Sequence, residues 1–71
     1  MEHYLIKATI ILEVISMIMT EYSMTQRDAM EAFYLSVTGA ILAEDESGLY
    51  GQSPLYIFGL FKSEYEEKIK E

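Results

Sequence analysis

One stretch decides the fold of this chain: Asp45-Glu46-Ser47-Gly48-Leu49-Tyr50-Gly51-Gln52-Ser53-Pro54. Helix-breaking residues accumulate only here, between long segments whose apolar residues recur with helical spacing. The two glycines permit backbone angles that other residues avoid. Ser53 is a good helix N-cap, and Pro54 suits the first position of a helix, where its missing N–H costs nothing. We therefore predict a loop that ends by starting a helix.

Leu49 and Tyr50 lie inside this otherwise polar loop. An apolar pair in a solvated loop is most simply explained if it folds back over the hydrophobic core, because both side chains then leave water. We predict that Leu49 and Tyr50 form such a loop plug.

The chain is short and apolar. Its 71 residues are 51% hydrophobic and 24% charged, which favours one folded domain, residues 1–71, over a disordered chain. A core of this size supports folding only marginally. The sequence has no cysteine, which excludes disulfides and cysteine-based zinc sites and is compatible with a reducing cytoplasm. We expect a cytoplasmic protein that folds alone or with copies of itself.

Acidic residues dominate the charge: twelve Asp and Glu against five Lys and Arg give a formal net charge of -7. Such a charge repels phosphate backbones and anionic lipid surfaces over a Debye length of about 8 to 10 Å. The basic residues are scattered along the chain. We therefore expect no nucleic-acid binding and an easier approach to a basic protein. The alternative is that the charge only keeps a small apolar protein soluble.

Residues 3–22 are predicted to form one long helix, because strong helix formers and isoleucines follow one another without Gly or Pro. One wide apolar face, which we expect to face the core, comprises Tyr4, Ala8, Ile11, Leu12, Ile15, Ile18, Met19 and Tyr22. Ile6, Ile10 and Met17 lie on a different side. A chain this small can hardly cover a helix on two sides. We predict that another subunit covers this second set, in a homodimer or a larger assembly.

Two alternatives for this segment fit the sequence less well. A signal peptide or membrane span is disfavoured, because Lys7 and Glu13 interrupt the apolar run and the preceding residues, Glu2 and His3, are not a basic region. A β-strand remains an alternative because Ile and Val favour strands, but the run is long and does not alternate. We expect a helix that does not enter a membrane.

Two shorter helices are predicted to follow. Thr25 and the acid three residues later resemble a capping box, which starts a helix over residues 25–37. Its apolar stripe comprises Ala29, Met30, Phe33 and Val37. Thr38 and Gly39 weaken the helix because both are poor helix formers, and an apolar helical segment resumes over residues 39–45. The pattern leaves open whether 38–45 is a separate helix or a continuation.

Ser53 is predicted to cap a last helix over residues 53–69. Its apolar stripe comprises Ile57, Phe58, Phe61, Tyr65 and Ile69. Tyr56 and Leu60 fall on another flank, so this helix also carries more apolar surface than one neighbour can cover. The predicted fold class is all-α, a small bundle of three to four helices completed by self-association. Its predicted interface residues are Ile6, Ile10, Met17, Tyr56 and Leu60.

The run from Glu46 to Ile57, preceded by Phe33 and Ser36, resembles small uncharacterised bacterial helical proteins. In these, a Gly-Leu-aromatic turn leads into a Ser-Pro-x-Tyr-Ile helix start. The resemblance covers about the second half of the chain, and Gly39 departs from it, since a better helix former would be expected there. It implies a bacterial origin and a helical fold, and it leaves the function open.

The residue types give little support to catalytic or metal chemistry. The chain has one histidine, His3, and no cysteine, which disfavours a Ser-His-Asp triad or a Cys-His pair. The acids at 44–46 lack the spacing of an EF-hand calcium loop, and no Glu-x-x-His motif of a di-iron bundle is present. Gly48 and Gly51 lack the lysine of a phosphate-binding loop. We expect no enzyme activity, no metal and no cofactor.

Two functions from different classes remain. The first is a non-enzymatic, homo-oligomeric protein–protein interaction module or regulator that presents an acidic surface, including the acids at 44–46, to a basic protein. The second is a small apolar-ligand-binding protein. Its pocket would lie under the loop at residues 48–52, lined by Phe33, Phe58 and Tyr56.

Overall fold

The computed structural model describes residues 4–70, except for the side chains of Tyr4, Asp45, Ile69 and Lys70. Four α-helices account for most of this range: α1 (Tyr4–Tyr22), α2 (Gln26–Tyr34), α3 (Val37–Ala43) and α4 (Pro54–Lys70). Two short 3₁₀ helices, Asp45–Ser47 and Leu49–Gly51, lie in the long loop between α3 and α4. The described part contains no strand. The predicted all-α bundle is confirmed.

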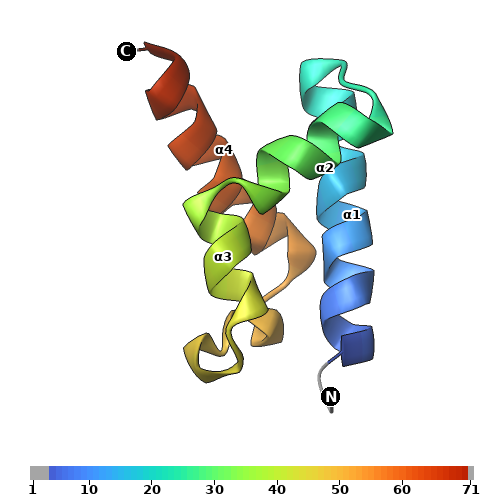
Figure 1. Cartoon of the computed structure of the whole chain (residues 1–71), viewed down its shortest axis with the longest axis vertical. Coiled ribbons are helices and arrows are strands. Elements are labelled where there is room, and N and C mark those ends of the chain that lie inside the picture. The colour runs from blue at the N-terminus through green and yellow to red at the C-terminus, as the bar shows by residue number, and fades with distance from the viewer. Residues whose placement is uncertain (1–3, 71) are drawn as a thin grey trace.

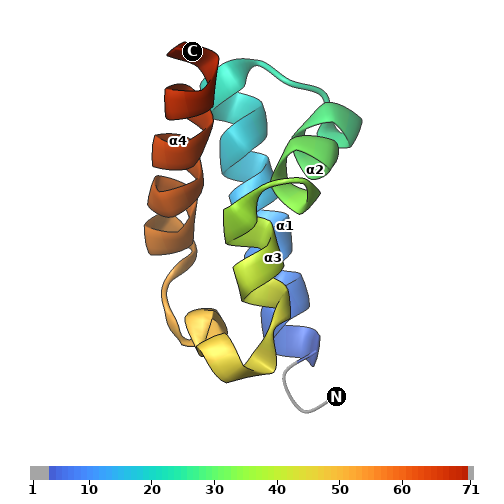
Figure 2. The same ribbon diagram turned by 60° about the vertical axis from the view of Figure 1, so that its left-hand side comes forward.

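Helix α1 packs against α2 and α4, and α3 packs against the same two helices. α1 and α4 run in the same general direction, from the bottom to the top of Figures 1 and 2, whereas α3 runs the opposite way beside α4. α2 crosses the upper half of α1 and contacts it (Figure 1). The described range contains no helix that could span a membrane by its length and apolar content.

The core lies where the four helices meet. Its buried residues are Ile10, Val14, Ile15, Ile18, Ala29, Phe33, Leu42, Ile57 and Phe61. Aromatic rings extend it toward the C-terminal ends of α1 and α4: the ring centroids of Phe33 and Phe61 are 6.0 Å apart, and those of Phe61 and Tyr65 are 5.3 Å apart. The rings of Tyr22 and Tyr65 form a T-shaped pair with their centroids 4.9 Å apart. These four aromatic side chains connect α2, α4 and α1. Their rings adopt the offset and tilted arrangements that aromatic pairs favour.

The buried stripe of α1 differs from the predicted one. Ile15 and Ile18 are buried as expected, but Leu12 is 62% exposed and Ile10 only 6%. Val14, which belonged to neither predicted set, is also fully buried. The physical reason is that α1 packs between α2 and α4, which turns its buried stripe toward Ile10. The assignment of Leu12 to the core was therefore wrong, and Ile10, which was predicted to lie on a different side from the core, belongs to the core.

The break between the second and third helices falls earlier than predicted. α2 ends at Tyr34, and Ser36 caps a separate helix α3 by accepting a 2.9 Å hydrogen bond from the N–H of Gly39. Gly39 is thus inside a helix, where a Cβ would overlap the carbonyl oxygen of Phe33. Glycine is needed there for close approach of the backbone. Val37 is exposed as the first residue of α3 and is not part of the α2 stripe.

The remaining helix starts and the loop follow the sequence signals. Thr25 accepts a hydrogen bond from the N–H of Asp28 at 3.1 Å, and Ser53 accepts one from the N–H of Tyr56 at 3.2 Å. Gly48 has a φ of 70°, the left-handed conformation that glycine adopts most easily. Leu49 and Tyr50 are half-buried and pack against the core.

Candidate functional site

One face of the molecule, formed by α1 and the first turns of α4, carries two shallow apolar hollows. The first, of about 370 Å³, is lined by Ser16, Met17, Thr20, Glu21, Leu55 and Phe58. The second, of about 350 Å³, is lined by Leu5, Ile6, Thr9, Ile10, Glu13 and Pro54. Both lie between the same two helices, so we treat them as one surface, called here the α1–α4 face.

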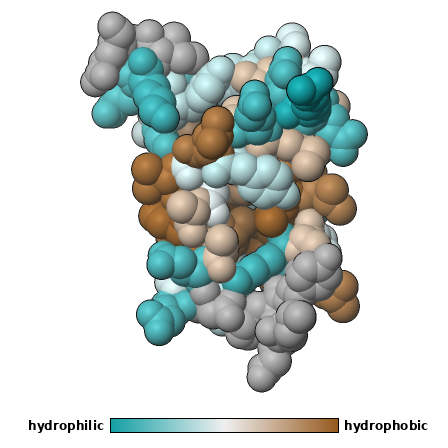
Figure 3. Space-filling view, in the orientation of Figure 1, coloured by the Kyte–Doolittle hydropathy of each residue, from teal (hydrophilic) through white to brown (hydrophobic). Residues whose placement is uncertain are grey.

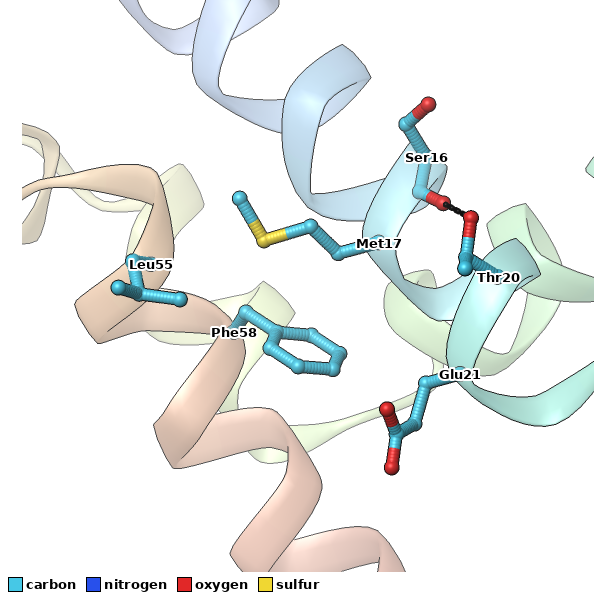
Figure 4. A pocket seen from close by; sticks show the side chains of 6 residues that line it. All are labelled: Ser16, Met17, Thr20, Glu21, Leu55 and Phe58. Carbon is cyan, nitrogen blue, oxygen red and sulfur yellow. Dashed lines mark hydrogen bonds between the residues drawn. The ribbon is translucent and has the colours of Figure 1, made fainter.

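Figure 4 shows how the first hollow is built. Met17 extends from α1 toward α4, and its side chain ends near those of Leu55 and Phe58. Thr20 donates its hydroxyl to the carbonyl oxygen of Ser16 at 3.2 Å. In the second hollow, Thr9 donates in the same way to the carbonyl of Leu5 at 3.0 Å. Because these hydroxyl donors are already satisfied, covering this face would leave them hydrogen-bonded.

The charge on this face is partly neutralised. Lys62 on α4 forms a 3.0 Å ion pair with Glu21 on α1. The hydrogen bond to the Glu21 carboxylate, together with its negative charge, raises the pKa of Lys62. Glu13 is an exposed carboxylate that lines the second hollow. The face is thus mainly apolar, with one ion pair at one end and one carboxylate near its middle.

The structure separates the residues predicted to form one interface. Ile6 is exposed and Met17 half-buried, and both line the α1–α4 face. Ile10 belongs to the core and forms only part of the floor of a hollow. Tyr56 and Leu60 line neither hollow. The predicted set therefore does not form a single site.

Two residues of the α1–α4 face were missed by the sequence analysis. Leu5 is 74% exposed and Leu55 is 68% exposed, the highest values among the large apolar side chains that line the two hollows. Leu55 follows Pro54 in the first turn of α4, next to the predicted cap. Its spacing to Phe58, three residues on, is the signal that could have placed both on one side of the helix.

A second apolar surface lies on the other flank of α4, beside α3. It comprises Val37, Ile41, Tyr56 and Leu60, whose exposed fractions range from 39% to 62%. Val37 and Ile41 are four residues apart on α3, as are Tyr56 and Leu60 on α4, so each pair shares one side of its helix. We call these four residues the α3–α4 patch.

Glu64 fixes how α3 and α4 align next to this patch. Its carboxylate accepts hydrogen bonds from the N–H of Val37 at 2.7 Å and from the N–H and hydroxyl of Thr38 at 3.1 and 3.0 Å. A carboxylate of α4 therefore satisfies N–H groups at the N-terminus of α3, where the helix dipole favours negative charge. Partial burial by itself raises the pKa of Glu64, but the three hydrogen bonds and the positive charge of Lys68 together outweigh it and lower the pKa.

A third hollow, of about 410 Å³, lies between α1, α2 and α3, and is lined by Lys7, Ala8, Ile11, Leu12, Tyr34 and Ala43. Lys7 donates from Nζ to the carbonyl oxygen of Ala43 at 3.0 Å, and this Nζ lies 5.8 Å from the centroid of the Tyr50 ring. The loop at 48–52 therefore adjoins this hollow. Hydrophobic surface forms a band across this side of the molecule, between more hydrophilic ends (Figure 3).

The residues predicted to line a loop pocket do not line any one of the hollows described above together. Phe33 is fully buried, Phe58 lines the α1–α4 face, and Tyr56 is exposed.

No group of three or more His, Cys, Asp or Glu side chains that could hold a metal ion occurs among the described residues. His3 lies outside them. Comparison of this chain with models of protein families, with curated proteins and with solved structures finds no match. The inferences below therefore start from the surfaces and charges of the chain itself.

Proposed function

We propose that this chain is a non-enzymatic helical interaction module of the bacterial cytoplasm, and that it self-associates through the α1–α4 face. The observation that carries the proposal is the position of Leu5, Ile6 and Leu55. These large apolar side chains are exposed around two shallow hollows between the same two helices. Contiguous apolar surface of this kind is characteristic of contact sites between proteins.

The dimensions of the face suit a second copy. α1 has 19 residues and is therefore about 28 Å long. Two helices packed about 8 to 10 Å apart give a surface about 20 Å wide. This is the scale of a standard interface, which buries about 800 Å² on each partner. Protruding side chains beside hollows on the same face also allow each copy to fill the hollows of the other in a two-fold contact.

The size of the protein favours such a contact. Among the described residues, nine apolar side chains are buried in the core, and the chain has no cysteine to form a disulfide. Domains of this length often depend on oligomerisation for stability. The net charge of -7 opposes association of two copies, although salt screens charges separated by more than about 8 Å at physiological ionic strength. Dimerisation should therefore strengthen as salt is added.

Thermal unfolding at several protein concentrations tests the proposal. Because a dimer is stabilised by mass action, its Tm should rise with concentration. Leu55→Ser should reduce this dependence, since Leu55 is exposed in the monomer and buried in the dimer. Leu12→Ser is the matched control, because Leu12 is similarly exposed on α1 but lines the third hollow instead. A Tm that does not change with concentration would contradict self-association, and an equal effect of both variants would contradict the choice of face.

A second candidate function is the binding of a small apolar ligand in the third hollow. Its volume of about 410 Å³ falls in the range of ligand sites, and a single cation, Lys7, stands among mainly apolar lining residues. An apolar ligand with one anionic group would match this lining. A thermal-shift titration with a medium-chain fatty acid tests this: the Tm should rise for the wild type and stay constant for Ala8→Trp, which would fill the hollow. No rise in the wild type would contradict ligand binding.

A further inference from the structure

The α3–α4 patch has acidic groups at both ends and none among its own residues. Glu67 lies eleven residues after Tyr56 on α4, close to three full turns, so it continues the side of the helix that carries Tyr56 and Leu60. Glu67 is exposed. At the other end, Glu44 follows the last residue of α3 and Glu46 lies two residues further, and both are exposed.

The alignment of the two helices places these acids about three helical turns apart. Glu64 bonds to the first residues of α3, and α3 and α4 run in opposite directions (Figures 1 and 2). The C-terminal end of α3, with Glu44, therefore lies beside the early turns of α4, near Tyr56. From there to Glu67 is about 16 Å along the helix axis, at about 1.5 Å per residue.

Lys62 and Lys68 of α4 lie away from the side of the helix that carries Tyr56 and Leu60. Lys62 is paired with Glu21 on the α1 side of the helix. Lys68 lies beside Leu35 and Tyr65, among residues that line a separate small hollow. Lys7 also reaches the C-terminal end of α3, where its Nζ bonds to the carbonyl oxygen of Ala43 at 3.0 Å. The two carboxylates of Glu44 and Glu46 outnumber this cation, so that end of the patch keeps an excess of negative charge.

We propose that the α3–α4 patch binds an amphipathic helix of a partner protein, with an apolar stripe flanked at both ends by lysine or arginine. The stripe would cover Ile41, Tyr56 and Leu60, as apolar helix faces do in helix-in-groove recognition. The basic ends would meet Glu67 on one side and Glu44 and Glu46 on the other. This inference rests on the proposed interaction role, but it adds a surface that does not require the dimer.

A second copy of this chain fits the patch less well than such a helix. In a two-fold contact between two patches, the end with Glu67 of one copy would face either the same end or the end with Glu44 and Glu46 of the other. Carboxylates would meet carboxylates in both arrangements, and like charges placed together disfavour association. The charge pattern therefore favours a partner of opposite sign.

The test uses the full chain and three fluorescein-labelled peptides of about 18 residues, long enough for about five helical turns. The first peptide has leucines at positions i, i+3, i+4 and i+7 and lysines at both ends. The second has glutamates in place of the lysines, and the third has serines in place of the leucines. Fluorescence anisotropy measures binding, and circular dichroism melting confirms that each protein variant is folded.

We expect the lysine peptide to bind with micromolar Kd and the other two at least about tenfold more weakly. Leu60→Ser should weaken binding of the lysine peptide at least about tenfold, because truncating a central apolar contact removes much of an interface's affinity. Leu35→Ser, at the C-terminal end of α2 where Leu35 is 76% exposed, is the matched control and should leave it unchanged. The double change Glu44→Gln and Glu67→Gln should reduce the preference for lysine over glutamate ends.

Several outcomes would overturn the inference. These are no saturable binding of the lysine peptide up to millimolar concentration, equal binding of the lysine and glutamate peptides, or a loss caused by Leu35→Ser and not by Leu60→Ser. Sedimentation of the same variants separates this inference from the proposed dimer. If Leu60→Ser dissociates a dimer, the patch is an interface between copies, which contradicts the helix-binding inference. If only peptide binding fails, self-association through the α1–α4 face stands.

Discussion

Replacing Gly39 by alanine should destabilise the protein, although a glycine-to-alanine change inside a helix ordinarily stabilises it. Alanine gains about 1 kcal/mol over glycine in helix propensity. At position 39, however, the new Cβ would overlap the carbonyl oxygen of Phe33, approach its carbonyl carbon at 3.1 Å, and lie 3.3 Å from the Ser36 hydroxyl oxygen. Backbone atoms cannot rotate away, so α3 must shift relative to α2.

The cost of that shift can be estimated. Overpacking costs about 1 to 3 kcal/mol, and the upper part of this range applies because the obstacle is backbone. Subtracting the propensity gain leaves a net loss of about 1 to 2 kcal/mol. In a domain of this size each kcal/mol shifts Tm by about 4 to 8 °C. Chemical denaturation followed by circular dichroism, at one low protein concentration, measures the change.

Gly59 provides the matched control. It also lies inside a helix, α4, but nothing stands within 4 Å of the position a Cβ would take. Gly59→Ala should therefore stabilise the protein by about 0.5 to 1 kcal/mol. Opposite signs for the two variants would support the close contact between α2 and α3. A stabilising Gly39→Ala would refute it, because propensity alone would then govern both positions.

Three further predictions concern Glu64, Tyr22 and the loop. Glu64→Ala should destabilise by about 1 to 3 kcal/mol in denaturant unfolding, because it leaves the N–H groups of Val37 and Thr38 without their acceptor. The exposed Glu67→Ala should change stability by about 0.5 kcal/mol or less. The pKa of Glu64 in the folded protein is lowered from 4.5, so its contribution to the free energy of unfolding is complete above about pH 4.5 and is lost as pH falls through the folded value. Acidification should therefore reduce the stability of Glu64→Ala less than that of the wild type. Equal losses would contradict this. Burial and the 3.0 Å hydrogen bond to Glu66 raise the pKa of Tyr22 from 10.0 to about 12, so the stability this adds is complete below pH 10 and lost as pH rises through 12. The free energy of unfolding, measured across this pH range, should fall less for Tyr22→Phe than for the wild type. Leu49→Ala and Tyr50→Ala should each lower the free energy of unfolding by about 1 to 2 kcal/mol in denaturation experiments. This is about half the value for a fully buried side chain, because both are half-buried. A negligible change in both variants would refute the loop plug.

The elements that local sequence signals specify were predictable. Thr25 and Ser53 cap helices as their residue types indicate, and the glycines and Pro54 place the loop correctly. Each of these signals acts within three or four residues along the chain, so no tertiary information is needed to interpret it.

The features that depend on packing between helices were not predictable in the same way. The buried side of α1 includes Ile10 and excludes Leu12, because α2 and α4 decide which side is covered. The end of α2 precedes the poor helix formers Thr38 and Gly39, because Ser36 caps α3 and Glu64 bonds to its first N–H groups from 26 and 27 residues away. Helical periodicity alone predicts neither the buried side of α1 nor the end of α2.

The candidate surfaces show the same division. Ile6 and Met17 were placed correctly outside the core by periodicity, and both line the α1–α4 face. Tyr56 and Leu60 were also placed correctly off the core stripe of α4. Their separation from Ile6 and Met17 depends on the positions of α1 and α3 around α4, which a single-helix projection does not describe.

The most direct test of the central claim is sedimentation equilibrium of the full chain at about 10 to 100 µM, with Leu55→Ser and Leu12→Ser in parallel. Self-association through the α1–α4 face predicts a wild-type mass that approaches twice 8.2 kDa as concentration rises. It also predicts that Leu55→Ser shifts the mass toward the monomer while Leu12→Ser does not. A wild type that remains at 8.2 kDa over the whole concentration range would contradict the claim.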